Sequence, residues 1–239
     1  MTALEDWLAK HPYLQPVAEL QAVVDSALAS ISMSDASTPD WSAYLEDFHA
    51  GIPLLQSANA AVDLSPVESA LRKLVDALGA TTLAARREDP GLLRFSRSAI
   101  LARYVCAVVR AFDRWRDEER WLRNYCPTCG SLPAMAQLVG KDSGHLRFLV
   151  CGACRTHWRY RRTGCPFCEH QDDRPLAVLD VEGEGGLRID YCETCRGYLK
   201  TCNGTGNESV LLADWTSLHL DLLARDRGLT RLAASLYEL

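Results

Sequence analysis

Eight of the ten cysteines in this 239-residue chain fall into four Cys-x-x-Cys pairs. The pairs are "CPTC" from Cys126, "CGAC" from Cys151, "CPFC" from Cys165 and "CETC" from Cys192. Four thiolates can surround a metal ion tetrahedrally at about 2.3 Å, and each tight Cys-x-x-Cys turn supplies two of them. The pattern therefore predicts two metal ions, each held by four sulfurs.

An internal repeat indicates which pairs share an ion. Residues 146–155 read "LRFLVCGACR" and residues 187–196 read "LRIDYCETCR", at a constant offset of 41 residues, while "CPTC" and "CPFC" are offset by 39. A duplicated unit of this kind predicts two similar modules in tandem. Site 1 is then Cys126, Cys129, Cys151 and Cys154, and site 2 is Cys165, Cys168, Cys192 and Cys195. An interleaved, cross-braced pairing is the less favoured alternative.

The residue after the first pair of each module differs between the two copies. Gly130 tolerates the positive φ that often closes such a turn, whereas its counterpart is Glu169. We therefore expect a looser or more exposed first turn at site 2. Zinc and iron both suit tetrahedral sulfur, so the ligands alone leave open a structural zinc and a rubredoxin-type iron that exchanges one electron.

Closed four-sulfur sites leave no position for a substrate, and the chain shows no Ser-His-Asp array, phosphate loop or paired acid and base. We therefore predict a protein that is not an enzyme. The rival reading of one pair as a thioredoxin-like redox centre requires a βαβ pattern around a single motif, and none is visible.

The composition and the first residues suggest a compartment. The start "MTALEDWLAKHP" lacks the basic and apolar regions of a signal peptide, so we expect a cytoplasmic protein. In a reducing compartment, repeated Cys-x-x-Cys pairs favour metal binding over disulfides. The most apolar run, "SAILARYVCAVVRAF", is interrupted by Arg103 and Arg110, so no membrane insertion is predicted.

The segments outside the cysteine region read as helices. Apolar residues recur at helical spacing over residues 14–31, 41–49 and 67–78, and Pro66 is a helix-start signal for the third segment. One long helix is expected over residues 92–122, with Cys106 as a small core residue in its apolar stripe. A last helix is expected to end at Gly228 and to pack against the body of the protein.

Cationic and aromatic residues alternate in "CRTHWRYRRTG". The candidate partner-binding residues here are Arg155, Trp158, Arg159, Arg161 and Arg162. Such a mixture can bind single-stranded nucleic acid through charge and stacking. Residues 125–200, however, carry a formal charge of only +1, which falls to −3 when eight thiolates hold two divalent ions. Because nucleic-acid binding needs many positive contacts, a protein partner is favoured.

With the four pairs in order, the chain resembles the FdhE family of formate dehydrogenase accessory proteins. The resemblance covers roughly residues 90–230 and includes "CPTCGSLP", "LRFLVCGACRTHWRYRRTGCPFC", "YCETCRGYLK" and "LADWTSLHLDLLARDRG". It implies a helical N-terminal region and two rubredoxin-like modules, in which all eight paired cysteines match the metal-binding pairs of the family. It also implies a role in the maturation of respiratory formate dehydrogenase, through contact with its catalytic subunit.

We therefore expect an α+β fold. The predicted parts are a helical domain at 1–124, two rubredoxin-like or zinc-ribbon modules at 125–163 and 164–203, and a C-terminal helical segment at 204–239. The predicted function is a cytoplasmic assembly factor or chaperone for formate dehydrogenase. The alternatives are a zinc-ribbon nucleic-acid-binding protein and a rubredoxin-like electron carrier.

Overall fold

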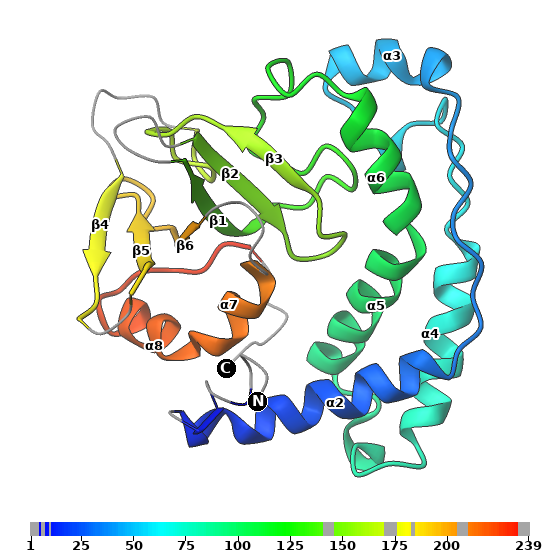
Figure 1. Ribbon diagram of the computed structural model, residues 1–239, viewed down its shortest axis with the longest axis horizontal. Coiled ribbons are helices and arrows are strands. Elements are labelled where there is room, and N and C mark those ends of the chain that lie inside the picture. The colour runs from blue at the N-terminus through cyan, green and yellow to red at the C-terminus, as the bar shows by residue number, and fades with distance from the viewer. Residues whose placement is uncertain are drawn as a thin grey trace.

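The structure combines an N-terminal group of helices with one sheet and two short C-terminal helices (Figure 1). It is a computed structural model that describes residues 5, 8–9, 11–140, 146–169, 176–182, 185–204 and 210–233. This mixture of helices and sheet, with two clusters of four cysteines, confirms the predicted fold class.

Local sequence signals set the N-terminal helices. The side chains of Asp40 and Asp89 accept hydrogen bonds from the backbone amides of Ser42 and Leu92, in the first turns of α3 and α5, as N-cap residues do. The helices expected over 14–31, 41–49 and 67–78 are all present. No helix in the described part of the chain is long and apolar enough to cross a membrane. The bounds are η1 Pro12–Leu14, α2 Gln15–Ala29, α3 Trp41–Ala50, η2 Leu54–Gln56, α4 Ser65–Leu78, η3 Ala84–Arg86, α5 Pro90–Tyr104 and α6 Cys106–Trp115.

The single long helix predicted over residues 92–122 is wrong. The helix is interrupted at Val105, which has φ −90° and ψ 4°. A separate helix, α6, follows and ends at Trp115. The break changes the phase of α6, so that Val108 and Phe112 face the core while Cys106 is exposed. The prediction that Cys106 is a core residue is therefore also wrong, because it assumed one uninterrupted helical stripe.

Each copy of the sequence repeat contributes three antiparallel strands to one six-stranded sheet. The strands are β1 Pro133–Val139, β2 Leu146–Cys151, β3 His157–Tyr160, β4 Ala177–Asp180, β5 Leu187–Tyr191 and β6 Tyr198–Gly204. Their order is β3-β2-β1-β6-β5-β4, and only β1 and β6 pair in parallel. The two modules therefore share a sheet, and the domain boundaries proposed from the sequence stay predictions.

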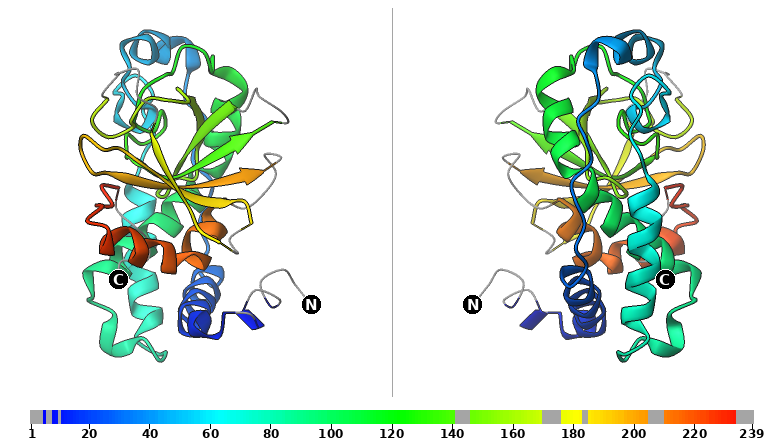
Figure 2. Two further views of the ribbon diagram at one scale, coloured as in Figure 1. Left: turned by 90° about the vertical axis from the view of Figure 1, so that its left-hand side faces the viewer. Right: turned by 90° about the vertical axis from the view of Figure 1, so that its right-hand side faces the viewer.

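The two faces of the sheet pack against different helices (Figures 1 and 2). One face carries Leu149 and Trp158 and joins a core with α5 and α6. The opposite face carries Ile189 and Tyr198, which pack against Leu220 of α8. The last helix, expected as one element, is divided at Ser217 into α7 Val210–Thr216 and α8 Leu218–Asp226.

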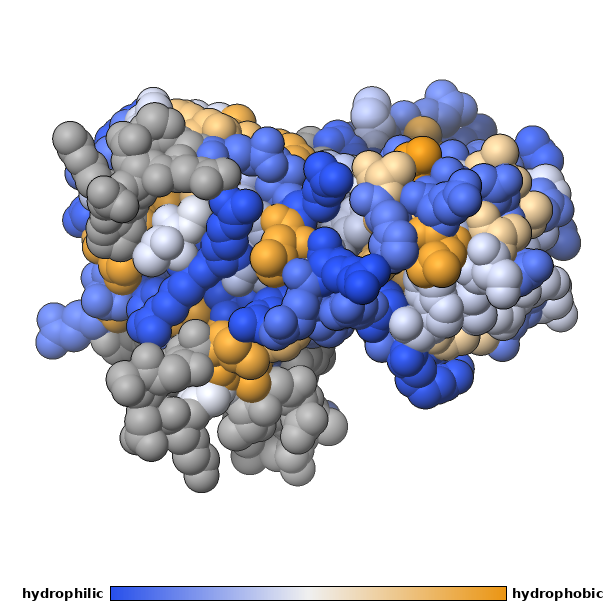
Figure 3. Space-filling view, turned by 90° about the horizontal axis from the view of Figure 1, so that it is seen from above, coloured by the Kyte–Doolittle hydropathy of each residue, from blue (hydrophilic) through white to orange (hydrophobic). Residues whose placement is uncertain are grey.

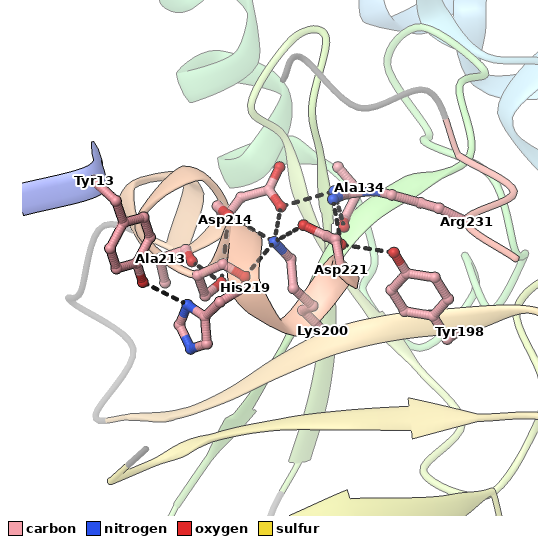
Figure 4. A network of polar contacts seen from close by, with 10 residues as sticks. Tyr13, Ala134, Tyr198, Lys200, Ala213, Asp214, His219, Asp221 and Arg231 are labelled. Atoms are coloured by element: carbon pink, nitrogen blue, oxygen red, sulfur yellow. Dashed lines mark hydrogen bonds and ion pairs between the residues drawn. The ribbon is translucent and has the colours of Figure 1, made fainter. Parts of the chain in front are cut away.

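A buried ionic network attaches α7 and α8 to the sheet (Figure 4). Lys200 of β6 is fully buried, and its Nζ lies 2.9 Å from Asp214 Oδ1 and 2.6 Å from Asp221 Oδ2. Arg231 also pairs with both carboxylates, at 2.8 and 3.0 Å. The predicted packing of the C-terminal helical segment against the body is thus confirmed for the described residues.

Candidate metal centres

The four sulfurs of site 1 converge on one point. The Sγ atoms of Cys126, Cys129, Cys151 and Cys154 all lie within 4.8 Å of one another. Two of the distances are 3.4 Å, between Cys126 and Cys154 and between Cys129 and Cys151. Tetrahedral coordination with metal–sulfur bonds of 2.3 Å would place sulfurs about 3.8 Å apart. The group could therefore hold one metal ion.

Site 2 forms a second cluster of the same kind. Cys165, Cys168, Cys192 and Cys195 place their Sγ atoms within 4.8 Å of one another. The Cys165–Cys195 and Cys168–Cys192 distances are 3.7 and 3.8 Å, close to the value for a filled tetrahedral site. The structure brings together the two groups that the repeat predicts, and not the interleaved ones.

A common backbone turn positions each cysteine pair. In the three turns whose last residue the structure describes, the amide of the first cysteine donates to the carbonyl five residues later; these amides are those of Cys126, Cys151 and Cys192, at 2.8, 2.9 and 2.9 Å. The residue after the second cysteine has a positive φ in all four turns, at Gly130 (79°), Arg155 (63°), Glu169 (52°) and Arg196 (60°). The left-handed conformation expected at Gly130 is therefore general, although only one of the four positions is glycine.

Site 1 is mostly buried, and this shapes the chemistry of its thiols. Burial raises the pKa of Cys126 and Cys154, while hydrogen bonds from the neighbouring thiols lower the pKa of Cys129. The hydroxyl oxygens of Thr156 and Ser131 lie 3.1 and 3.3 Å from sulfurs of the site. Since four adjacent thiolates, three of them buried, repel one another, a bound cation is the group that would keep all of them deprotonated.

Site 2 is more exposed, as expected from its sequence. Cys168 is exposed and Cys195 is partly exposed. Burial raises the pKa of Cys165 and Cys195. Burial alone would also raise the pKa of Cys192, but backbone amides of Cys195 and Thr194 donate hydrogen bonds that help to lower it to about 7. This site therefore has both a solvent-facing ligand and a thiol that ionises readily.

The N-terminal helical region holds the first turn of site 1 directly. The amides of Leu54 and Leu55 in η2 donate to carbonyl oxygens within residues 126–129, at 2.9 and 2.8 Å. Gln56 Nε2 donates to the carbonyl of Cys129 at 3.1 Å. These contacts join segments about 70 residues apart, and no local sequence signal indicates them.

The candidate partner-binding residues divide into buried and exposed positions. The prediction is wrong for Trp158, because alternation along β3 turns its ring inward: it is 0% exposed, and its Nε1 donates to the carbonyl of Arg123 at 3.0 Å. Arg159 is partly exposed and forms an ion pair with Glu119. The remaining three side chains, whose role in binding stays a prediction, are exposed: Arg155, Arg161 and Arg162.

Comparison with known proteins gives a consistent result. The family model described as "FdhE, central domain" matches residues 125–162, which include all of site 1. A "Protein FdhE homolog" of Aquifex aeolicus is 33% identical over 142 residues, which cover 57% of this chain and 49% of the relative. Another, of Pseudomonas aeruginosa, is 36% identical over 125 residues, 48% of this chain and 39% of the relative. The chain is thus similar to FdhE proteins, and its residues 125–162 match the central domain of that family.

Solved structures extend the likeness to the overall fold. The crystal structure of the FdhE protein from Pseudomonas aeruginosa superposes with a TM-score of 0.63 at 22% identity, and the match covers 94% of this chain and 88% of that one. The sequence matches are shorter, and the chain spans about half the length of the curated FdhE relatives that it matches.

Proposed function

We propose that the protein is a non-catalytic accessory factor for the assembly of respiratory formate dehydrogenase, and that it binds the catalytic subunit of that enzyme in the cytoplasm. The observation that carries the proposal is the pair of four-cysteine clusters within an FdhE-family fold. Four sulfurs complete a tetrahedral shell and leave no position for a substrate. This supports a binding role for the two sites over hydrolysis at a metal.

The second candidate is electron transfer, and the exposure of Cys168 favours it. If site 2 holds iron, a solvent-facing sulfur gives a redox partner a short path to the ion, and exposure is one of the factors that set the potential of iron–sulfur centres. If both sites hold zinc, their role is structural. Metal analysis and a visible spectrum of anaerobically purified protein separate these cases, since a colourless protein with two zinc ions excludes electron transfer.

The surface supports a protein partner more than nucleic acid. Trp158 and Tyr160, the aromatic residues of the alternating segment, are both buried and cannot stack on bases. The face in Figure 3 is largely hydrophilic, with small and separate apolar patches. A mixed surface of this kind is typical of non-obligate protein interfaces. The exposed Arg155, Arg161 and Arg162 are our candidates for contacts with the catalytic subunit.

A tagged, anaerobic pull-down at low salt tests the proposal. The bait is expressed in a host with its own formate dehydrogenases, and retained protein and nucleic acid are both quantified. We expect retention of the catalytic subunit, and its loss when Cys126 and Cys129 are both replaced by Ala. Cys106→Ala is the matched control, because this thiol is exposed and outside both clusters. Retention of RNA alone, released by salt, would replace the proposal with nucleic-acid binding.

A further inference from the structure

Arg147 of β2 is a buried cation with few partners. It is 1% exposed, and its Nη1 donates to the carbonyl of Gly164 at 3.1 Å. Among the residues that the structure describes, neither its Nε nor its Nη2 has a hydrogen-bond partner, and both atoms are buried. A buried charge is strongly unfavourable unless an opposite charge lies nearby. The molecule should therefore contain an anion that compensates this guanidinium.

The second module of the sequence repeat offers a comparison for Arg147. The counterpart of Arg147 in the second module is Arg188, at the offset of 41 residues. Arg188 Nε pairs with Asp190 Oδ1 at 2.8 Å, two residues along the same strand. In the first module the position of Asp190 is taken by Leu149, which is fully buried. Arg147 thus keeps the charge of its counterpart but has no carboxylate two residues along its own strand.

Arg147 contacts the residue that precedes the first turn of site 2. Gly164, which accepts the hydrogen bond from Arg147, directly precedes Cys165. Tyr160, the cross-strand partner of Arg147, donates to the carbonyl of Cys165 at 3.2 Å. Burial lowers the pKa of Arg147, while Asp190, Tyr160 and the Cys165 thiolate act in the opposite direction. A residue of the first module thus places its charge beside a ligand of the second site.

Asp190 alone does not account for the charge of Arg147. Its Oδ1 is paired with Arg188, and its Oδ2 accepts a hydrogen bond from Thr201 at 2.9 Å. A divalent ion held by four thiolates, by contrast, carries a net charge of about −2. A filled site 2 is therefore an anion of suitable sign and position.

We propose that Arg147 is a positioning residue whose positive charge stabilises the metal-filled state of site 2. The inference rests on the proposed metal sites and extends them: filling the second site compensates a charge buried in the first module. Arg147 thereby couples the two modules through the sheet that they share. Removing the charge should weaken metal binding at site 2 and leave site 1 unchanged.

Zinc competition on the full-length chain tests this inference. Affinity is measured against a chromophoric chelator, with Cys168→Ser and Cys151→Ser variants reporting on site 1 and site 2 alone. We expect Arg147→Gln to weaken site 2 at least tenfold and to leave site 1 within about twofold, with a tenfold change corresponding to about 1.4 kcal/mol. Arg147→Lys, which keeps the charge, should restore most of the affinity. Tyr160→Phe removes the neighbouring hydrogen bond without a charge, and should have a small effect.

A double-mutant cycle separates this role from ordinary structural support. Arg147→Gln should destabilise the zinc-loaded protein in urea, yet be neutral or stabilising in the Cys168→Ser background, where site 2 cannot fill. Equal destabilisation in both backgrounds, equal loss at both sites, or an equal effect of Tyr160→Phe would overturn the inference. A wild-type protein that holds no metal at site 2 would overturn both the role of Arg147 and the proposal that this cluster binds metal. Two bound ions without retention of formate dehydrogenase would overturn the proposed function and not the role of Arg147.

Discussion

At the scale of single residues, the residue that follows each cysteine pair adopts the same left-handed backbone conformation, whatever its type. Gly130, Arg155, Glu169 and Arg196 all adopt a positive φ. For a residue with a side chain this conformation costs about 1–2 kcal/mol relative to ordinary backbone, and glycine escapes the cost. The same turn conformation thus accompanies every Cys-x-x-Cys pair, and three of these residues adopt it at some cost in stability.

Glu169→Gly should therefore stabilise the protein. We expect a gain of about 0.5–1 kcal/mol, because the release of strain exceeds the entropy that glycine adds to the unfolded chain. Urea unfolding of the metal-loaded protein measures the effect. A loss of stability would mean that the Glu169 side chain makes a favourable contact that outweighs the strain of its backbone.

Gly130→Ala should have the opposite effect, for two reasons. The φ of +79° is unfavourable for alanine, and an added Cβ would lie 2.2 Å from Gln56 Nε2, which donates to the carbonyl of Cys129. We expect a loss of about 1–3 kcal/mol and weaker metal binding at site 1, measured by zinc competition. Gly185→Ala is the control, because a Cβ there meets no atom within 4 Å. Unchanged zinc affinity at site 1 would show that η2 does not support the turn.

At the scale of elements, the sequence was most informative where a pattern is local or repeated. The pairing of cysteines followed from a constant offset between two copies, and three helices followed from apolar spacing. The break at Val105 was not predictable in this way, because apolar residues continue through it without a proline or glycine. The burial of the Trp158 side chain was not predicted. Alternating Arg and aromatic residues are typical of a β-strand with one buried face and also of a nucleic-acid-binding segment.

Two further features depend on contacts that are distant in sequence. The parallel pairing of β1 with β6 joins the first strand of one module to the last strand of the other, although each module alone reads as an antiparallel unit. The docking of η2 on the turn at 126–129 uses mainly backbone groups, which carry no signature in the sequence. Patterns within a module therefore do not determine how modules associate.

The network that attaches α7 and α8 allows a quantitative test. Lys200→Met leaves Asp214 and Asp221 buried with Arg231 as their remaining cation, so we expect a loss of about 3–5 kcal/mol. Arg120→Met is the control, because its pair with Asp117 is exposed and such pairs contribute about 0–1 kcal/mol. Urea unfolding at neutral pH measures both. Equal effects would mean that the buried network contributes no more than a surface ion pair.

The same network should make the protein sensitive to acid. Burial alone would raise the pKa of Asp214, but Lys200 and Arg231 lower it below its ordinary value. A carboxyl group whose pKa is lowered on folding contributes stability that is fully present above the pKa of the unfolded state, about 3.9, and is lost as the pH falls through the folded-state value. Lys200→Met removes one of the two cations that lower this pKa, so the stability of the variant should depend less on pH below about pH 4. An unchanged dependence would assign the acid sensitivity to other carboxylates.

At the scale of the whole molecule, one sheet connects two four-cysteine sites in different environments. Site 1 lies between the sheet and the N-terminal helices, with three buried cysteines and backbone support from η2. Site 2 lies farther along the shared sheet and exposes Cys168. The repeat therefore produced two similar clusters whose different surroundings fit one centre that supports the fold and another that can interact with a partner.

Metal removal should consequently proceed in two steps. A chelator can reach the exposed sulfur of site 2 directly, whereas loss of the ion from site 1 requires opening of the core that packs around it. We expect a fast and a slow phase of metal release, measured with a chromophoric chelator. Most of the decrease in Tm should accompany the slow phase, because structural metal binding contributes folding free energy on the order of 10 kcal/mol. Cys168→Ser should abolish the fast phase and Cys151→Ser the slow one. A single phase, or a decrease in Tm confined to the fast phase, would mean that exposure does not distinguish the two centres and that both are equally part of the folded core.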